Sequence, residues 1–160
     1  MEIETVKIEK PTEVNLIFGQ AHFIKTAEDL YETLVTAVPG IKFGLAFAEA
    51  SGPCLVRTEG TDKKLEKMVA ENLRKIGCGH SFLIFLKDAY PINVLNAIKS
   101  VAEVCQIFCS TANPAEVVVG QGKTGRAVLG VIDGISPKGS ENDKNKNERK
   151  SFLRQIGYKR

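Results

Sequence analysis

The sequence lacks three features that would each assign the chain to a special class of protein. No apolar run approaches the roughly 18 residues that a membrane-spanning helix needs. The first five residues, MEIET, are acidic and do not have the basic-then-apolar arrangement of a signal peptide. The four cysteines contain no C-x-x-C pair. We therefore expect a cytoplasmic protein without a membrane partner.

The sequence also has no large excess of charge of either sign. The 22 Lys and Arg residues against 19 Asp and Glu give a formal net charge of +3. Residues 141–160 contain seven basic and three acidic side chains, and this difference of +4 leaves the rest of the chain close to neutral. Because a nucleic-acid-binding protein usually has a basic face across its folded body, we expect no nucleic-acid partner and interpret the basic end as a solvated helix.

The cysteine spacing predicts neither disulfides nor a metal site. Cys105 and Cys109 fall in one expected strand, where about 3.3 Å per residue separates them by roughly 13 Å, too far for a disulfide. Cys78 and His80 offer two metal ligands, but the sequence has no matching second pair. We therefore expect reduced thiols that act as small buried apolar side chains, and no metal site.

The length of 160 residues fits one domain. Alternating strands and helices favour parallel strands joined by right-handed crossovers, whereas the short connection over 120–126 indicates a hairpin. We therefore expect a single α+β domain, residues 1–160, with a mixed β-sheet and helical crossovers packed on it. Apolar periodicity predicts strands over 14–18, 43–47, 81–86, 107–110, 116–119 and 127–132, helices over 26–38, 62–76 and 93–104, a loop over 133–147 and a C-terminal helix over 148–158.

The segment Gly122-Lys123-Thr124 resembles the end of a P-loop but fails two requirements of that motif. The position that needs the first glycine is Val117, and the segment opens into a strand instead of a helix. A glycine-rich hairpin turn is the simpler interpretation. Its backbone N–H groups, with Lys123 and Arg126, still offer a place for an anion.

Two histidines are the leading candidates for chemistry. His22, beside Gln20, lies between the first strand and the first helix, and His80 lies in the turn Gly77-Cys-Gly-His-Ser81. Glycines give such a turn backbone conformations that other residues avoid, and an imidazole beside it can bind an anion and attack it. The competing interpretation is two structural histidines, because the spacing shows no nucleophilic triad.

Polar side chains also follow three expected strands. Glu49, Asp88 and Asn113 come directly after strand ends, which is where ligands gather in wound α/β sheets. We expect the three to converge on one cleft, with ordinary loop and capping chemistry as the alternative. His80 begins its strand, so it reaches such a cleft only if a turn or a partner chain brings it round.

Segments spread over nearly the whole chain resemble the adenosine-specific kinases, a family of archaea and bacteria. The matching segments are NLIFGQAHFIK (15–25), VPGIKFG (38–44), EASG (49–52), GHSF (79–82), YPINVLNAI (90–98), IFCSTANP (107–114), LGVIDG (129–134) and FLRQIGY (152–158). The resemblance implies an α+β fold, a homo-oligomer with a trimer as one option, adenosine and AMP as ligands, and a histidine that carries phosphate.

On this resemblance we expect an enzyme that transfers a phosphoryl group to or from adenosine, with His80 as nucleophile and His22 as a second catalytic residue. No resident cofactor is expected, and magnesium would accompany a nucleotide phosphate donor. A sensor that binds adenosine or AMP without catalysis, and an interaction protein that assembles through apolar strands, are the alternatives. The expected ligand-binding residues are Gly19, Gln20, Lys25, Glu49, Ser51, Gly79, Ser81, Asp88, Asn113 and Arg126.

Overall fold

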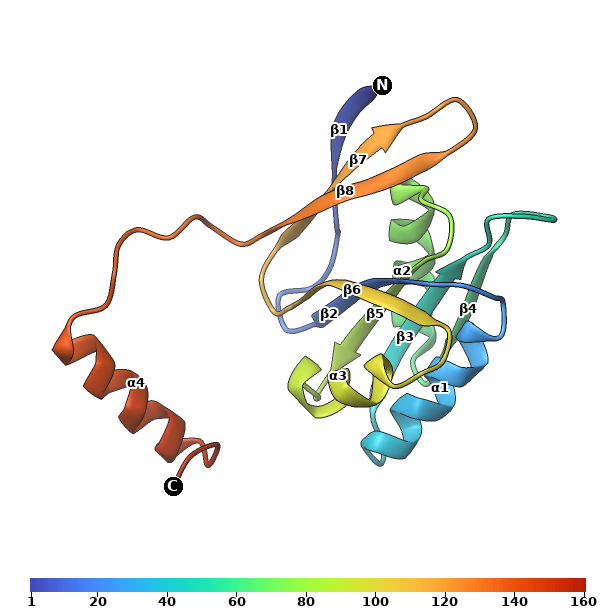
Figure 1. Ribbon diagram of the computed structural model, residues 1–160. Helices are drawn as coiled ribbons and strands as arrows, with labels where there is room; N and C mark the ends of the chain where they lie inside the picture. Colours follow the sequence, from blue (N-terminus) through green and yellow to red (C-terminus); the bar gives the residue numbers. More distant parts are fainter.

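The computed structural model describes residues 1–160 and places eight strands in two antiparallel sheets, with four α-helices (Figure 1). The larger sheet has the order β4 (Val56–Gly60), β3 (Lys42–Ala48), β5 (Ser81–Lys87), β2 (Asn15–Ala21) and β6 (Val104–Thr111). The smaller has the order β1 (Glu2–Lys7), β7 (Ala115–Gln121) and β8 (Arg126–Asp133). The helices are α1 (Thr26–Ala37), α2 (Lys63–Ile76), α3 (Pro91–Lys99) and α4 (Asp143–Gln155).

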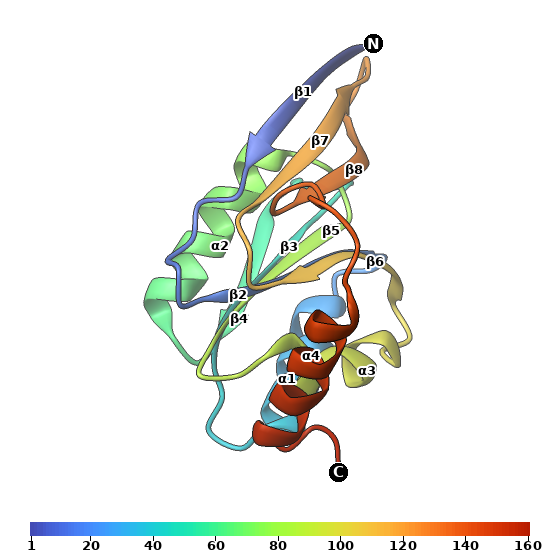
Figure 2. The same ribbon diagram turned by 90° about the vertical axis from the view of Figure 1, so that its left-hand side faces the viewer.

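Both faces of the larger sheet are covered. Helices α1 and α3 pack on one face, and helix α2 with the smaller sheet packs on the other (Figures 1 and 2). Each face has its own cluster of buried apolar side chains, of 15 and 17 residues respectively. The central strands β2, β3 and β5 are therefore almost fully buried, which agrees with their near-continuous apolar sequences. The expected α+β class and single domain describe this arrangement.

The expectation of parallel pairs within one sheet is wrong, because every strand ladder is antiparallel. Strands β2 and β3 do run in the same direction, as the α1 crossover requires, but β5 lies between them. Strands β5 and β6 likewise run in the same direction with β2 between them. Each of these crossovers thus joins two strands that have one other strand between them, so the sequence order gives the strand directions correctly but not the neighbours.

Apolar periodicity in the sequence did not predict two of the strands. Both lie at sheet edges and carry exposed or half-buried side chains, β1 as EIETVK and β4 as VRTEG. Strand β4 pairs with β3 as a hairpin, and β1 pairs with β7 from more than 100 residues away. An edge strand needs apolar residues on one side at most, so neither segment shows the buried run that identified the others.

The cysteines divide equally between surface and interior. All four are free; Cys78 and Cys109 are buried, whereas Cys54 and Cys105 are exposed, contrary to the expectation that all are buried. Burial raises the pKa of the Cys78 thiol, and burial with the neighbouring Asp133 raises that of Cys109 to about 11.

No helix is both long and apolar enough to cross a membrane.

The C-terminal helix begins five residues before the expected position. Asn142 caps it: its side chain accepts a hydrogen bond from the Asn145 backbone N–H at 3.0 Å, and the Asn145 side chain accepts one from the Asn142 backbone N–H at 3.1 Å. The expected loop over 133–147 is thereby reduced to residues 134–142. Figure 1 shows α4 standing clear of the rest of the chain, and it overlaps α1 and α3 in Figure 2 only because of the viewing direction.

Candidate functional site

Both histidines line one cavity of about 610 Å³. His22 follows β2, and His80 immediately precedes β5, which is the antiparallel neighbour of β2. The end of one strand therefore lies beside the start of the other, and the loop after β3 closes the third side. The remaining lining residues are Phe23, Ile24, Phe47, Glu49, Ala50, Ser51, Gly52 and Pro53.

His80 has an unusual backbone. Its φ of 59° lies in the left-handed region, where a residue other than glycine costs about 1–3 kcal/mol. Its N–H donates to the Ala48 carbonyl at 2.7 Å, and its carbonyl accepts from the Ala21 N–H at 2.9 Å. The imidazole stacks on the Phe47 ring with the centroids 5.8 Å apart and the planes 18° apart. Hydrogen bonds and stacking thus hold the half-buried ring in one orientation at the cavity wall.

Strained backbone is concentrated near this cavity. Four residues other than glycine have positive φ, and two of them, Phe23 and His80, line the cavity. A third, Cys54, directly follows Pro53, which also lines the cavity. Such strain persists only where the surrounding structure enforces it, and it is enriched at ligand sites.

The glycine turn before His80 is tightly packed. A Cβ atom on Gly79 would come within 2.8 Å of the Ala50 side chain, so the turn lies directly against the loop after β3. The buried Ser81 hydroxyl donates to the Cys78 carbonyl at 2.5 Å, which braces the turn from within. Ser81 does not line the cavity, so its expected contact with phosphate has no support from its position.

Glu49 is the only carboxylate that lines the cavity. One oxygen accepts from the Leu55 N–H at 2.9 Å and the other from the Arg57 guanidinium at 2.7 Å. The Leu55 N–H and, next, Arg57 lower the pKa of Glu49, so this group stays ionised and acts as an acceptor. Both bonds also fix the loop that carries Ser51, which lines the same cavity.

Lys25 is engaged in an ion-pair cluster beside the cavity. Its ammonium group contacts Asp29 and the buried Glu103, and the hydrogen bonds to Asp29 and then Glu103 raise its pKa. Gln20 accepts a hydrogen bond from Gln106 at 3.0 Å. Neither Lys25 nor Gln20 lines the cavity.

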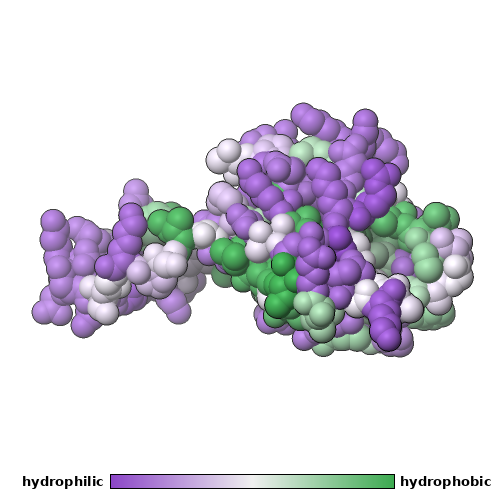
Figure 3. All heavy atoms as spheres, turned by 90° about the horizontal axis from the view of Figure 1, so that it is seen from above, coloured by the Kyte–Doolittle hydropathy of each residue, from purple (hydrophilic) through white to green (hydrophobic).

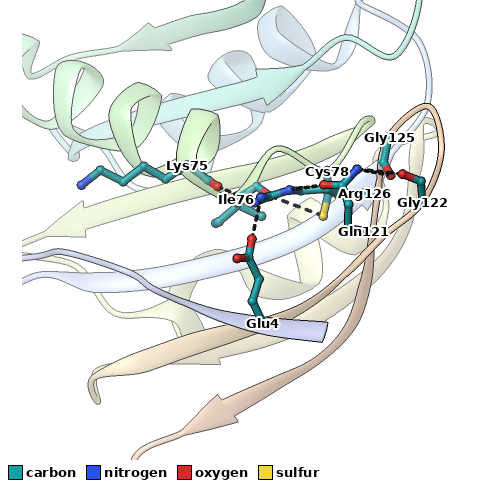
Figure 4. A network of polar contacts seen from close by, with 8 residues as sticks. All are labelled: Glu4, Lys75, Ile76, Cys78, Gln121, Gly122, Gly125 and Arg126. Carbon is teal, nitrogen blue, oxygen red and sulfur yellow. Dashed lines mark hydrogen bonds and ion pairs between the residues drawn. The ribbon is translucent and has the colours of Figure 1, made fainter. Parts of the chain in front are cut away.

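Arg126 connects four parts of the chain (Figure 4). Its guanidinium donates to the Lys75 carbonyl at 3.1 Å and the Ile76 carbonyl at 3.4 Å, at the C-terminal end of α2. It also donates to Gln121 at 2.9 Å and forms an ion pair with Glu4 at 2.5 Å. These contacts make Arg126 a link between α2 and the smaller sheet, with little charge left unpaired.

A second hollow of about 550 Å³ shares Glu49 and Ala50 with the first. It is lined by the glycine turn before His80, by Thr124 and Gly125 of the β7–β8 hairpin, and by Arg74 and Arg126. The exposed Arg74 forms no ion pair. Cationic side chains thus line this hollow, whereas no Lys or Arg lines the histidine cavity.

Asp88 and Asn113 do not converge with Glu49, so that expectation is wrong. Asp88 follows the end of β5 whose start adjoins His80, and the eight residue steps from His80 to Asp88 span about 26 Å. Asn113 follows β6 at the same distant end, where its side chain donates to Asp133 at 3.0 Å. Because β3 is antiparallel to β5, the end of β3 that precedes Glu49 lies at the opposite end of the sheet from the ends of β5 and β6, and this separates Glu49 from the other two residues.

Sequence reasoning missed the aromatic part of the cavity. Phe23 and Ile24 are exposed, although both are large apolar residues. Their position in a junction that also contains His22 was the available signal, because a solvated loop rarely needs such side chains. Gly19 was expected to contact a ligand, but a Cβ there would lie 2.5 Å from the Phe82 ring, so its lack of a side chain serves packing.

Comparisons with known proteins agree over almost the full length of the chain. A family model described as adenosine specific kinase matches residues 6–159. The crystal structure of the PH1918 protein from Pyrococcus horikoshii OT3 superposes with a TM-score of 0.96. That protein is 49% identical, and the match covers 99% of this chain and 98% of the other. No curated protein is significantly similar to the chain.

Proposed function

Because the chain belongs to the adenosine-specific kinase family, we propose that it transfers a phosphoryl group to or from adenosine, which binds in the cavity shared by His22 and His80. One observation carries the proposal: both histidines open onto the same cavity. A nucleoside pocket needs an apolar surface for the base and a few polar groups for the ribose. Phe23, Ile24 and Pro53 supply the first, and Glu49 with Ser51 supplies the second.

In this proposal a His80 ring nitrogen is the nucleophile. Its lone pair attacks the terminal phosphorus of a nucleoside triphosphate donor, and the bond from phosphorus to the bridging oxygen breaks, with its electron pair leaving on the nucleoside diphosphate. The fixed orientation of the ring favours this step, because phosphoryl transfer depends mainly on positioning and charge stabilisation.

The second step moves the phosphoryl group to the nucleoside. The adenosine 5′ oxygen attacks phosphorus, the phosphorus–nitrogen bond breaks, and its electron pair returns to the His80 ring. His22 accepts the proton of the 5′ hydroxyl, as the other imidazole of the cavity. Glu49 accepts hydrogen bonds from the ribose hydroxyls, consistent with its lowered pKa. The product is AMP, and the reverse reaction uses the same groups.

The donor phosphates belong in the second hollow. Arg74 and the N–H groups of Gly79 and Gly125 are suited to an anion there, and this hollow adjoins the turn that carries His80. No cluster of three or more His, Cys, Asp or Glu side chains offers a metal site. Magnesium in this proposal therefore enters with the donor phosphates, and no step depends on a metal ion held by side chains.

The proposal is tested by the same substitution at each histidine. Incubation with γ-labelled ATP should give acid-labile, base-stable label on the wild type and none on His80→Asn, because the nucleophile is absent. His22→Asn should retain the label but pass it to adenosine at least about 100-fold more slowly, because it lacks the base. Both variants should bind adenosine with affinities within a few-fold of wild type in a calorimeter.

Other results have definite meanings. Label that persists on His80→Asn contradicts His80 as the nucleophile. Saturable adenosine binding without any label on the wild type supports the non-catalytic sensor instead, an alternative favoured by the absence of Lys and Arg from the histidine cavity. A folded wild type that binds neither adenosine nor AMP rules out both functions.

A further inference from the structure

The C-terminal arm, residues 134–160, has no packing surface within its own chain. No side chain of α4 is buried, and its apolar residues are open to solvent, with Phe152 56% exposed and Ile156 and Tyr158 also exposed. Its three ion pairs all join residues of the arm to each other. Phe152, Leu153 and Ile156 lie on one side of the helix, so the arm presents a continuous apolar face with no partner.

A helix of this kind is not stable alone. It has 13 residues, and isolated helices shorter than about 12–15 residues are marginal in water even when rich in alanine. Its sequence, DKNKNERKSFLRQ, contains two asparagines, a serine and an aspartate, all weak helix formers. The helix therefore needs a surface to pack against.

The smaller sheet has an apolar face that the chain leaves open. Its inner face carries Val117 and Val119 into the core, and the register places Ile3, Val118 and Ile132 on the opposite, outer side. Leu129 lies on the same side over Gly120 and is 49% exposed. The space above Gly130 is empty to 4 Å, whereas the side chains of Met1 and Leu129 cover Gly120, so Gly130 leaves a shallow gap between exposed apolar side chains. A helix face is a common cover for such a sheet face.

Charge does not oppose the contact. By the register, the outer face of the smaller sheet carries Lys7 and Glu116 as its charged strand residues, so it has no excess of positive charge to repel a basic arm. Residues 143–160 contain seven basic residues against two acidic ones, a difference of +5. Seen from above, the arm is mainly hydrophilic with a small hydrophobic spot, and a hydrophobic patch lies on the body next to the start of the arm (Figure 3).

The extended arm is not peculiar to this chain. The crystal structure of the PH1918 protein superposes over 99% of the chain with a TM-score of 0.96, which is incompatible with an arm folded back onto the body there. An extended, ordered helix in a crystal requires a partner outside its own chain. From these observations we propose that the arm of one copy packs its apolar face on the outer face of the smaller sheet of a second copy.

The test measures the mass of full-length chains in solution. We expect the wild type to be an oligomer, and Phe152→Asp on the arm and Leu129→Asp on the sheet each to give monomers at about 10 µM, because each buries a charge in the contact. Ser151→Asp adds the same charge on the opposite side of α4 and should stay oligomeric. Circular dichroism and thermal unfolding confirm that each variant is folded.

Mixing the two disrupted variants identifies the contact. The Leu129→Asp variant has an unaltered arm, and the Phe152→Asp variant has an unaltered sheet surface. A 1:1 mixture should therefore form a two-chain species that neither variant forms alone. An arm–arm or sheet–sheet contact gives no such rescue and overturns the proposal. A monomeric wild type, or an oligomeric Phe152→Asp, also overturns it.

A rival acceptor is tested in parallel. The groove between α1 and α3 is lined by small side chains together with Asp29 and Glu32. Thr33→Asp within this groove should leave the oligomer intact. Loss of the oligomer in Thr33→Asp together with its survival in Leu129→Asp assigns the arm to the groove instead of the sheet. None of these variants touches the histidine cavity, so the outcome is independent of the proposed activity.

Discussion

His80 combines three local properties that rarely occur together in a histidine. Its backbone is left-handed, its ring stacks on Phe47, and both its backbone polar groups are hydrogen-bonded to neighbouring segments. The enclosing structure therefore supplies the free energy that holds the strained turn. A rigid imidazole on a cavity wall loses little conformational entropy when it reacts, which favours a role in group transfer over a purely structural one.

Glu49 allows a prediction about pH. Its pKa is lower in the folded than in the unfolded protein, so its contacts with Leu55 and Arg57 stabilise the fold above about pH 4.5 and are lost as the pH falls through the lowered value. Glu49→Gln should therefore lower the thermal midpoint at pH 7, and this difference from wild type should shrink as the pH falls below 4.5.

The control is Glu28→Gln, which removes an exposed carboxylate that forms no ion pair. It should change the midpoint little at either pH. A difference for Glu49→Gln that is the same at pH 7 and pH 3 would mean that the loop contacts do not depend on its charge.

At the scale of elements, the packing of α2 on β3 depends on one glycine. A Cβ at Gly44 would lie 2.3 Å from the Glu66 nitrogen and from the Leu65 carbonyl carbon, so the helix backbone rests directly on the strand. The first turn of α2 is fixed there by Asp62, whose carboxylate accepts from the Lys64 and Leu65 amides at 2.9 and 3.1 Å. The atoms that face Gly44 belong to the backbone of α2, so no flexible side chain can move aside there.

Gly44→Ala should therefore reduce the free energy of unfolding by about 1–3 kcal/mol, because overpacking forces α2 away from β3. Urea denaturation measures this change. Gly125→Ala provides the control, since nothing lies within 4 Å of a Cβ there and the expected change is within about 0.5 kcal/mol. Equal effects of the two substitutions would show that α2 adjusts freely.

Elements with a buried face were predictable from sequence, whereas their neighbours were not. The run Ser81–Leu86 and the stripe of Leu65, Val69 and Leu73 mark β5 and α2 because burial imposes apolar periodicity. The insertion of β5 between β2 and β3 leaves no local signal, because it is a pairing between segments that lie far apart in the sequence.

The candidate site follows the same division. His22 and His80 were found from their chemistry and their glycines, and Glu49 from its place after a strand. Asp88 and Asn113 were grouped with Glu49 because parallel strands were assumed, so the error in topology became an error in the site. Arg126 was expected at a ligand from its charge, but only the structure places its guanidinium on the carbonyls at the end of α2.

The whole molecule consists of a body with a two-faced core and an arm that adds nothing to that core. If the arm packs on a second copy, part of the stability of the molecule is intermolecular and follows mass action. The thermal midpoint of the wild type should then rise with protein concentration, whereas that of Phe152→Asp should be constant. Scanning calorimetry over a hundredfold concentration range measures this, and a constant wild-type midpoint would indicate that the arm contributes no contact between copies.

The pairing of β1 with β7 also sets the order in which the protein matures on the ribosome. Residues 2–7 find their partner only after residues 115–121 have been synthesised, so the smaller sheet forms late and β1 waits unpaired while most of the chain emerges.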